Sequence, residues 1–467
     1  MIKRIVMMEG GVETLSYFSH QMAQEFQMLG YAVFFYDLKQ EESSAGKLRK
    51  FIRPRETVLV TFNFQGLEKE AGVYREGIGY LWDTYHIPCY NIAADHPYFY
   101  DDRLKDLPEK YRHISIDRRQ KAYFEEFYPE YVSRGFLPLA GTGLRQAEEE
   151  GEAEPLEARA QGAAVETGEA GAQGAAEQAA PCYDVILTGN YTKLSFFEPY
   201  INWINEEYAA FYRGIIDDLL EHPACTVEEV ALAHCEREMG KEPNDQLRIA
   251  LHKMIFIDLY VRNYWRGKAV RTLVNAGIPV HVVGKGWEEL EDVRHPECLK
   301  LHPQTDSVTC LEMLADAKVS LNVMPWFKDG AHDRVFNSIL NGAVCVTDPS
   351  CYLEEELHEG EGVCYVALQD MDALPEKVKD LLQNDSGRNE IVRRGRAIVA
   401  VFKPQLSSSP DCAAWQSDCG AEAYLGTARE DAGSVDCGGR RAIDKGQSAE
   451  NTGDSMRTGR GSGESAY

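Results

Sequence analysis

The sequence lacks any run of apolar residues long enough to cross a membrane. A membrane helix needs roughly 18 or more consecutive apolar residues, and no stretch of the 467 residues approaches that length. The N-terminal run MIKRIVMMEGG stops being apolar at Glu9, too early for the core of a signal peptide, and is typical of a first β-strand. The sequence therefore predicts a cytoplasmic protein with no stable membrane insertion.

Positive charge is also scarce. There are 49 Lys and Arg residues against 75 Asp and Glu, which gives a net charge of −26 at pH 7. Such a balance disfavours binding to nucleic acid or to anionic lipid by general electrostatic attraction. It leaves open a local phosphate-binding cleft within an acidic surface. We therefore expect no nucleic-acid partner but do not exclude a phosphorylated ligand.

Paired metal-binding side chains are missing as well. The twelve cysteines are scattered, and no Cys-x-x-Cys pair occurs, so neither a zinc spacing nor a small disulfide framework is visible. The cysteines are typical of small buried hydrophobic residues in a reducing compartment. No cluster of carboxylates has a spacing that suits a hard cation. The sequence predicts no metal site.

What the sequence does contain is alternating strand and helix patterns. An apolar strand at residues 2–8 is followed by Gly10 and Gly11, then by a helical pattern up to Gly30, and then by a second strand at 31–36. This βαβ opening is of the Rossmann type. Residues 1–145, with further predicted strands at 57–62, 86–92 and 113–116, are predicted to form one Rossmann-like α/β domain.

Two segments break the pattern. Residues 146–181 are almost entirely Ala, Glu, Gly and Gln and cannot bury enough apolar surface to offset the entropy of ordering. We expect a low-complexity flexible insertion there. Residues 403–467 are rich in Gly, Ser, Asp and Arg without periodicity, which predicts a disordered, atypical tail. A frameshifted or recombined end is an open alternative for this tail.

Residues 182–402 resume the α/β pattern and are predicted to form a second Rossmann-like domain. A helical subdomain is expected at about 196–265, followed by strands near 277–284, 319–323 and 343–347. The predicted fold class is therefore α/β, with two Rossmann-like domains facing a cleft, a helical insertion and disordered segments. Open α/β folds bind ligands at the carboxyl ends of their strands, so the loops after strands are the candidate sites.

The most informative loop lies between the strands at 319–323 and 343–347. Turn residues including Gly330 lead into a helix whose apolar positions share one face and whose end is marked by Gly342. His332 and Arg334 stand at the helix start, where free backbone N–H groups favour anions. This arrangement indicates a diphosphate site. An ordinary βαβ crossover with one exposed Arg is the alternative that spacing alone leaves open.

Three other loops follow predicted strands. Gly284 and Lys285 suit a phosphate contact or a plain glycine turn, and the missing Walker pattern disfavours an ATPase. Asp95 and His96 suit a base with its orienting group or a contact to sugar hydroxyls, with a solvated turn as the alternative. Gly10 and Gly11 lack the third glycine of a dinucleotide fingerprint, so an oxidoreductase is a weaker third option.

Together these residues resemble nucleotide-sugar glycosyltransferases of the GT-B fold, and the closest likeness is to the CgeB/YkvP spore-maturation type. GGVETLS at 10–16 is similar to the acceptor-side glycine loop of that fold. HDRVFNSILNGAVCVTD at 332–348 resembles the donor-binding segment R-x-F-E-A-x-A-x-G. The likeness covers roughly residues 1–140 and 182–400.

The resemblance implies roles in donor binding for several of these residues. Gly330 and Arg334 would face the donor diphosphate, with Gly284 and Lys285 on the opposing side of the phosphates. Val335 and Phe336 would lie near the nucleoside. Asn337 stands where such enzymes commonly place a Glu that holds the donor ribose, and Asn offers hydrogen bonds without charge.

The leading hypothesis is a metal-independent glycosyltransferase that transfers a sugar from a nucleotide-diphosphate donor, UDP-linked, to a surface or spore-coat acceptor. No cofactor is expected, because the nucleotide sugar is itself the substrate. Asp95 and His96 are the predicted catalytic residues near the acceptor, Gly10 and Gly11 would shape its loop, and Gly330, His332 and Arg334 would bind the donor. The alternative is an inactive GT-B scaffold or binding protein associated with spore or envelope assembly, which Asn337 favours.

Overall fold

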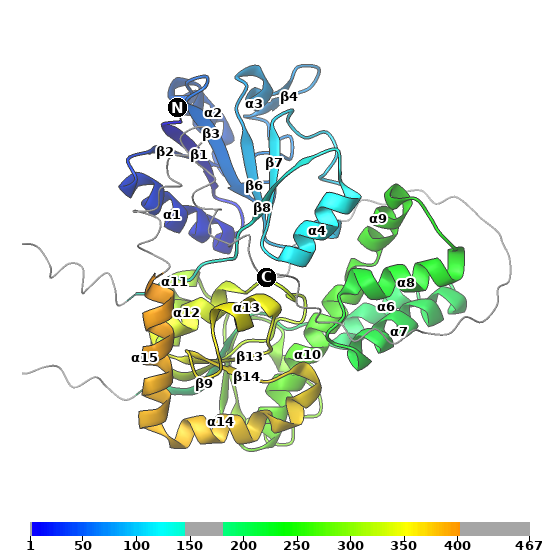
Figure 1. Cartoon of the computed structure of the whole chain (residues 1–467), viewed down its shortest axis with the longest axis vertical. Helices are drawn as coiled ribbons and strands as arrows, with labels where there is room; N and C mark the ends of the chain where they lie inside the picture. Colours follow the sequence, from blue (N-terminus) through cyan, green and yellow to red (C-terminus); the bar gives the residue numbers. More distant parts are fainter. Residues whose placement is uncertain (1, 145–180, 402–467) are drawn as a thin grey trace, which may run out of the picture.

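A computed structural model describes residues 2–144 and 181–401 and shows two parallel six-stranded sheets, each with helices around it (Figure 1). The predicted fold class, two Rossmann-like domains facing a cleft with a helical insertion, is confirmed. The flexible insertion predicted at 146–181, except for its last residue, and the tail predicted at 403–467 lie outside the described residues. None of the described helices combines the length and the apolar character that a membrane span requires.

The first sheet has the strand order β2-β1-β3-β6-β7-β8, with every neighbouring pair parallel. Strand β3 is buried along its whole length, as expected for a strand covered by helices on both faces. A short antiparallel hairpin lies between β3 and β6. The elements are β1 (Arg4–Glu9), α1 (Glu13–Met28), β2 (Ala32–Asp37), α2 (Glu41–Phe51), β3 (Thr57–Phe62), β4 (Tyr74–Arg75), β5 (Gly79–Tyr80), α3 (Leu81–Thr84), β6 (Cys89–Ala93), η1 (Pro97–Tyr100), β7 (Tyr111–Ser115), α4 (Arg118–Phe127) and β8 (Val132–Phe136).

The second sheet has the order β11-β10-β9-β12-β13-β14 and is also parallel. Numbered from its own first strand this order is 3-2-1-4-5-6, that of the dinucleotide-binding Rossmann fold, and it reverses between β9 and β12. Helices α14 and α15 close the domain (Figure 1). The elements are β9 (Tyr183–Thr188), β10 (Val280–Val283), η3 (Trp287–Glu289), η4 (Pro296–Cys298), β11 (Leu299–His302), α11 (Ser307–Ala315), β12 (Ala317–Leu321), α12 (Asp333–Asn341), β13 (Val344–Thr347), α13 (Cys351–Glu356), β14 (Val363–Tyr365), η5 (Leu368–Ala373), α14 (Leu374–Gln383) and α15 (Asp385–Val401).

A helical segment connects β9 to β10 and stands beside both sheets (Figure 1). Thr226 starts one of its helices with a reciprocal capping box to Glu229, which satisfies two backbone N–H groups. The long helix α10 is largely buried because it packs between this segment and the second sheet. The elements are η2 (Leu194–Phe197), α6 (Glu198–Ile201), α7 (Glu206–Glu221), α8 (Val227–Met239), α9 (Asn244–Lys253) and α10 (Ile255–Asn275).

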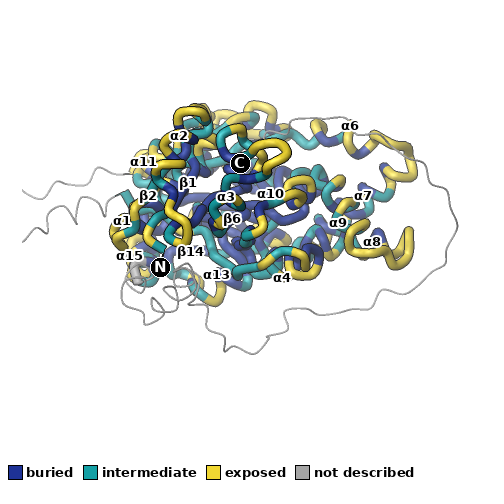
Figure 2. The backbone as a smooth tube through the Cα atoms, turned by 90° about the horizontal axis from the view of Figure 1, so that it is seen from above, coloured by how far each residue is buried: buried dark blue, intermediate teal, exposed yellow. Residues whose placement is uncertain are grey.

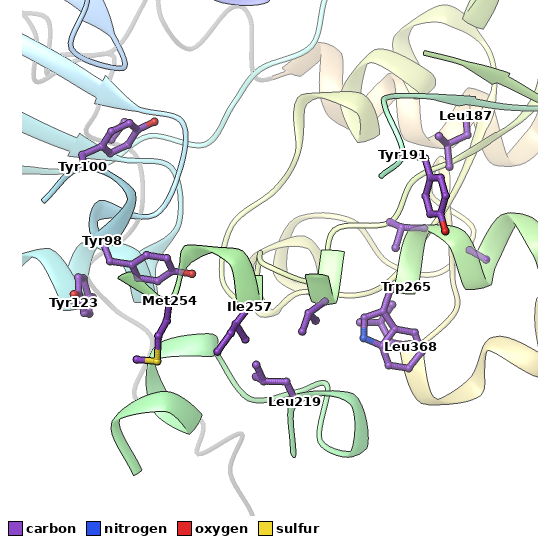
Figure 3. Packing of buried hydrophobic residues seen from close by; sticks show 14 of the residues in the cluster. Tyr98, Tyr100, Tyr123, Leu187, Tyr191, Leu219, Met254, Ile257, Trp265 and Leu368 are labelled. Carbon is purple, nitrogen blue, oxygen red and sulfur yellow. The ribbon is translucent and has the colours of Figure 1, made fainter. Parts of the chain in front are cut away.

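One hydrophobic cluster spans both domains. Tyr98 and Tyr123 of the first domain lie near Met254 at the start of α10, and the same cluster continues to Trp265 and Leu368 in the second domain (Figure 3). Buried residues accordingly run without interruption through the middle of the molecule, while exposed residues lie around its edges (Figure 2). The two domains and the helical segment therefore share a core.

Helix α9 of the helical segment contacts the first domain directly. The Arg248 guanidinium donates to the backbone oxygen of Phe127 at 3.1 Å and to Glu130 at 3.0 Å, and its Nε lies 3.3 Å from the buried carboxylate of Asp101. The Nδ1 of His252 lies 2.9 Å from the backbone oxygen of Tyr98. The helical segment thus holds the two domains together on one side of the cleft.

Asp117 makes a second connection between the domains. Its Oδ1 caps α4 by accepting from the backbone N–H groups of Arg119 and Gln120, at 2.8 and 3.1 Å. Its Oδ2 accepts from the N–H groups of Lys328 and Asp329 in the second domain, at 3.0 and 2.8 Å. One buried carboxylate therefore serves as a helix cap and as an interdomain anchor.

Candidate active site

A pocket lies between the domains at the carboxyl ends of both sheets. Its walls come from the start of α1, the loop after β6, the ends of β9 and β10, one face of α10 and the segment that leads into α12. In the second sheet this is the point where the strand order reverses, the usual ligand position in open α/β folds. The lining residues that matter for the chemistry are Glu13, Asp95, Gly189, Asn190, Arg262, Asn263, Arg266, Ser307, Trp326, His332, Asp333, Arg334 and Asn337.

Two guanidinium groups in the pocket, those of Arg266 and Arg334, form no ion pair with any carboxylate in the described part of the chain. Arg266 donates to the backbone oxygen of Asn190 at 2.5 Å, but its Nε and the Nη1 of Arg334 have no partner among the described residues. Burial, together with the charges of Arg334 and Arg262, lowers the pKa of Arg266 to about 9. Burial also lowers the pKa of Arg334. Shielded cations that form no ion pair are costly, so this pair favours an anionic ligand.

Two glycines lie where the loops after β9 and β10 pack against each other beside Arg334. Gly189 follows β9 with φ +143°, and a Cβ there would lie 3.5 Å from both terminal nitrogens of Arg334. Gly284 follows β10 with φ +153°, and a Cβ on it would lie 2.5 Å from the backbone oxygen of Gly189. Gly284, a predicted donor residue, therefore lets two strand ends meet and does not itself line the pocket.

Helix α12 begins at the pocket wall. His332 is its N-cap residue, and the Nδ1 of His332 lies 2.6 Å from the Oδ1 of Asp333. Burial and the nearby charge of Arg334 lower the pKa of His332 to about 4, so the ring is neutral near pH 7. The structure therefore brings the predicted residues His332 and Arg334 together at the pocket.

Asn337 also lines the pocket, and both of its amide atoms are engaged. Its Oδ1 accepts from the backbone N–H of Thr142 at 2.8 Å, and its Nδ2 donates to Asp333 at 2.9 Å. One turn later, Asn341 accepts from the N–H of Leu144 and donates to the oxygen of Thr142. These two Asn residues hold the segment that leaves the first domain against α12.

Asp95 faces the pocket from the first domain. It accepts from the hydroxyl of Tyr100 at 3.1 Å, and Arg262 of α10 lies 3.5 Å away. Arg262 is in turn held by Asp258 through contacts of 2.9 and 2.6 Å, and its guanidinium lies 4.3 Å from the ring centre of Trp326. Asp95 is therefore fixed by a buried network that crosses the cleft.

His96, predicted beside Asp95 as a catalytic residue, lies in a different place. Its ring stacks on Tyr98 at 3.9 Å, and its Nε2 lies 3.4 Å from a carboxylate oxygen of Glu228 in α8. It lines a small neighbouring cavity and not the main pocket. The two adjacent side chains are therefore separated, because Asp95 points into the cleft and His96 points toward the helical segment.

The remaining predicted residues lie outside the pocket lining. The side chain of Lys285 is exposed, while its backbone N–H donates to the side-chain oxygen of Asn190 and its backbone oxygen accepts from the N–H of Tyr191, both at 2.9 Å. Gly330 bridges to Asp117, and a Cβ on it would lie 2.5 Å from the oxygen of Ile116, so it belongs to the interdomain contact. Val335 and Phe336 pack in the hydrophobic core, where the backbone of Phe336 meets Gly141.

Gly10 and Gly11 allow close packing within the first domain. A Cβ on Gly10 would collide with the side chain of Asp37, and one on Gly11 would collide with Gln65. The pocket wall begins two residues later, at Glu13. The carboxylate of Glu13 accepts from the N–H and hydroxyl of Ser307 in the second domain, at 3.0 and 2.9 Å.

Several pocket residues were not predicted from the sequence. Arg262 and Arg266 lie four residues apart, so they share one face of α10, and this spacing is the only signal in the sequence that indicates them. Asn190 lies in the loop after β9 and Ser307 is the first residue of α11, and no sequence pattern indicates either of them. Within residues 2–144 and 181–401, no group of three or more His, Cys, Asp or Glu side chains has an arrangement suited to a metal ion.

Residues 265–401 match the model of a family described as glycosyl transferase-like. The sequence matches no curated protein. Among solved structures, the T4 phage BGT in complex with its UDP-glucose substrate is 11% identical, with a TM-score of 0.46, and the match covers 91% of this chain and 99% of that one.

Sucrose-phosphate synthase from Thermosynechococcus elongatus is 9% identical, with a TM-score of 0.44 and coverage of 85% and 94%. AviGT4, a glycosyltransferase involved in avilamycin A biosynthesis, is 12% identical, with a TM-score of 0.41 and coverage of 85% and 95%. The segment that contains Arg266 and Arg334 is similar in sequence to glycosyltransferases, within a fold of the two-domain GT-B kind.

Proposed function

We propose that the protein is a glycosyltransferase that takes a sugar from a nucleoside diphosphate, UDP in the simplest case, and transfers it to an acceptor in the interdomain pocket. The observation that carries the proposal is the pair Arg266 and Arg334. Two shielded cations without a carboxylate partner face the carboxyl edge of a Rossmann sheet, where a diphosphate has the complementary charge. The family match over 265–401 supports the same function.

The chemistry requires stabilisation of a leaving diphosphate. As the bond between the sugar carbon and the diphosphate oxygen breaks, negative charge grows on that oxygen, and Arg266 and Arg334 stabilise it. We propose that these side chains, rather than a metal ion, supply the positive charge. Asp95 lies across the pocket and takes the proton of the acceptor hydroxyl as the new bond to the sugar forms.

The finer assignment rests on the sequence resemblance. A CgeB/YkvP-type enzyme would act in the cytoplasm on a surface or spore-coat acceptor, a glycan or a protein. The GGVETLS loop and the 332–348 segment support this type. Asn337, which stands in place of the usual Glu and is engaged by Thr142 and Asp333, favours the second candidate, an inactive scaffold of the same fold.

Nucleotide binding tests the donor site. The thermal midpoint of the purified protein is measured with UDP, GDP, dTDP and their glucose conjugates, and the release of the nucleoside diphosphate is measured with the same nucleotide sugars. We expect stabilisation by one nucleotide series. Arg266→Ala and Arg334→Ala should each weaken that binding at least tenfold, since charge-assisted hydrogen bonds to phosphate contribute about 1.5–3 kcal/mol.

A matched control is Arg393→Ala, because the side chain of Arg393 is 69% exposed and pairs with Glu390 in its own helix, outside the pocket lining. This variant should bind nucleotide as the parent protein does. Absence of any nucleotide-dependent stabilisation in a folded parent protein would refute the donor site. Binding without release of diphosphate, for every donor and a panel of acceptor sugars, would favour the scaffold.

A further inference from the structure

An aromatic surface covers η2, α6 and the start of α7. It consists of Phe196, Tyr200, Trp203, Ile204 and Tyr208, whose exposed fractions are 53%, 49%, 77%, 40% and 47%. Five large apolar side chains within thirteen residues is an unusual concentration for the surface of a protein with this much charge, and such patches mark interaction sites. The segment lies in the helical part of the molecule, with its exposed residues at the periphery (Figure 2).

Ring contacts make this surface continuous. The rings of Phe196 and Tyr200 are 5.9 Å apart, and Tyr200 stacks on Phe256 of α10 at 6.2 Å. Phe256 contacts Tyr212 at 5.1 Å, and Tyr212 contacts Tyr208 at 6.2 Å. The exposed rings of Phe196, Tyr200 and Tyr208 are therefore held in place by less exposed ones, which gives a rigid platform at little cost in side-chain entropy.

The aromatic surface is adjacent to the pocket through α10. Leu259 and Asn263 of this helix line the pocket, while Phe256 and Tyr260 on the neighbouring face contact the rings of Tyr200 and Phe197. The chain also runs directly from the pocket to this surface, because Thr192 lines the pocket and donates its N–H to Asn263 at 2.8 Å. A ligand that leaves the pocket along α10 meets the aromatic surface.

The charges around the surface disfavour an anionic occupant. Glu206 and Glu207 are exposed beside Tyr208, and the whole chain carries a net charge of −26. Anionic lipid and nucleic acid are repelled by such a rim. A second copy of the chain would bring four carboxylates together across a two-fold interface, since the same patch faces itself in a symmetric dimer.

We infer that the aromatic surface binds the acceptor and that the acceptor is a neutral oligosaccharide. Apolar C–H faces of sugar rings stack on aromatic side chains, while the tyrosine hydroxyls and the indole N–H of Trp203 can form hydrogen bonds with the sugar hydroxyls. This inference rests on the proposed glycosyltransferase function, because it places the acceptor chain beside the donor pocket. The pocket residues indicate only the donor, and the aromatic surface additionally indicates the chemical class of the acceptor.

Binding of four neutral hexasaccharides tests the inference: maltohexaose, cellohexaose, laminarihexaose and chitohexaose. Titration calorimetry and tryptophan fluorescence are followed for the parent protein and for the combined variant F196A/Y200A/W203A. We expect at least one hexasaccharide to bind the parent protein, and the combined variant to bind it at least tenfold more weakly. The thermal shift with UDP should be the same in both proteins, since none of these residues lines the pocket.

Met28→Ala and Ile78→Ala are the controls, because these residues are 72% and 66% exposed on the first domain and lie outside the aromatic surface. Neither should change hexasaccharide binding. Failure of all four hexasaccharides to bind would overturn the inference. So would binding to phosphatidylcholine vesicles, or a dimer in light scattering, that the combined variant abolishes. A missing UDP shift with intact hexasaccharide binding would instead refute the donor site alone.

Discussion

The side-chain oxygen of Asn337 accepts a 2.8 Å hydrogen bond from the backbone N–H of Thr142, in the segment that leads out of the first domain. Its amide nitrogen donates to Asp333 at 2.9 Å. A Glu or Asp at this position accepts hydrogen bonds but donates none, and it would place a second carboxylate beside Asp333. The amide at position 337 is therefore required by the domain connection of this chain.

Asn337→Asp should destabilise the protein by about 1–3 kcal/mol, because it removes one buried hydrogen bond and adds like-charge repulsion. Urea unfolding at pH 7 measures the change. Asn384→Asp is the control, since Asn384 is exposed and its side chain only accepts, from Ser386 and Gly387. Equal stability of both variants would contradict the anchoring role of Asn337.

Asp117→Asn should reduce the free energy of unfolding by about 2–4 kcal/mol. An amide can accept the two bonds that cap α4, but its NH₂ group then faces the N–H groups of Lys328 and Asp329. Denaturant unfolding compares it with Asp306→Asn, because Asp306 caps only α11, at an exposed position. We expect the Asp306 variant to lose no more than about 1 kcal/mol. A similar loss in both variants would show that the interdomain bonds contribute nothing.

His113 should make the protein sensitive to acid. The ring stacks on Phe124 at 3.6 Å, and burial, with a smaller effect of His96, lowers the pKa of His113 from 6.5 to about 3. The unfolded chain therefore binds a proton between these pH values while the folded protein does not, so this residue costs stability as the pH falls below 6.5. The loss between pH 7 and pH 5 should be about 2 kcal/mol.

His113→Gln should remove that share of the pH dependence, whatever it does to stability at pH 7. The measurement is the difference between the free energies of unfolding at pH 7 and at pH 5, in the variant and in the parent protein. His295→Gln is the control, because the His295 side chain is 49% exposed. An unchanged pH difference in the His113 variant would show that the buried ring is not the cause.

Replacement of Arg262 should change the rate of the chemical step and not the affinity for the donor. It is already engaged by Asp258 and lies 3.5 Å from Asp95, so it positions the proposed base across the cleft. Arg262→Lys should lower kcat by at least tenfold and leave the UDP-dependent thermal shift unchanged. Arg266→Lys, in contrast, should weaken nucleotide binding. A loss of nucleotide binding in both variants would place Arg262 among the phosphate ligands instead.

Most of the fold could be predicted because its strands are apolar runs bounded by turn residues. Strands β3, β10, β12 and β13 occur where the alternation and the glycines indicate them, and Gly342 ends α12 in the left-handed conformation with φ +98°. Strand β8 was missed because its sequence, VSRGF, contains Arg and Gly and is only partly buried at the edge of the sheet. Edge strands carry a weak pattern because one side lacks a neighbour.

The candidate site was harder to predict, because its residues meet through contacts between distant parts of the chain. The sequence indicated Arg334, His332 and Asp95, which follow strands. The sequence did not indicate that Glu13 would contact Ser307, or that Arg266 of α10 would line the same pocket as Arg334. It also placed Val335 and Phe336 near the nucleoside, whereas their burial in the core follows from their position on the apolar face of α12.

The contact between α9 and the first domain has a consequence for synthesis of the chain. The first sheet is complete once Phe136 has been made, yet Tyr98 and Asp101 receive their partners His252 and Arg248 only after most of the helical segment has left the ribosome. Until then the buried carboxylate of Asp101 lacks the Arg248 cation, and Asp117 still lacks the N–H groups of Lys328 and Asp329. The nascent first half therefore carries polar groups that lack some of their partners until the second half is made, so the chain reaches its full stability as one unit.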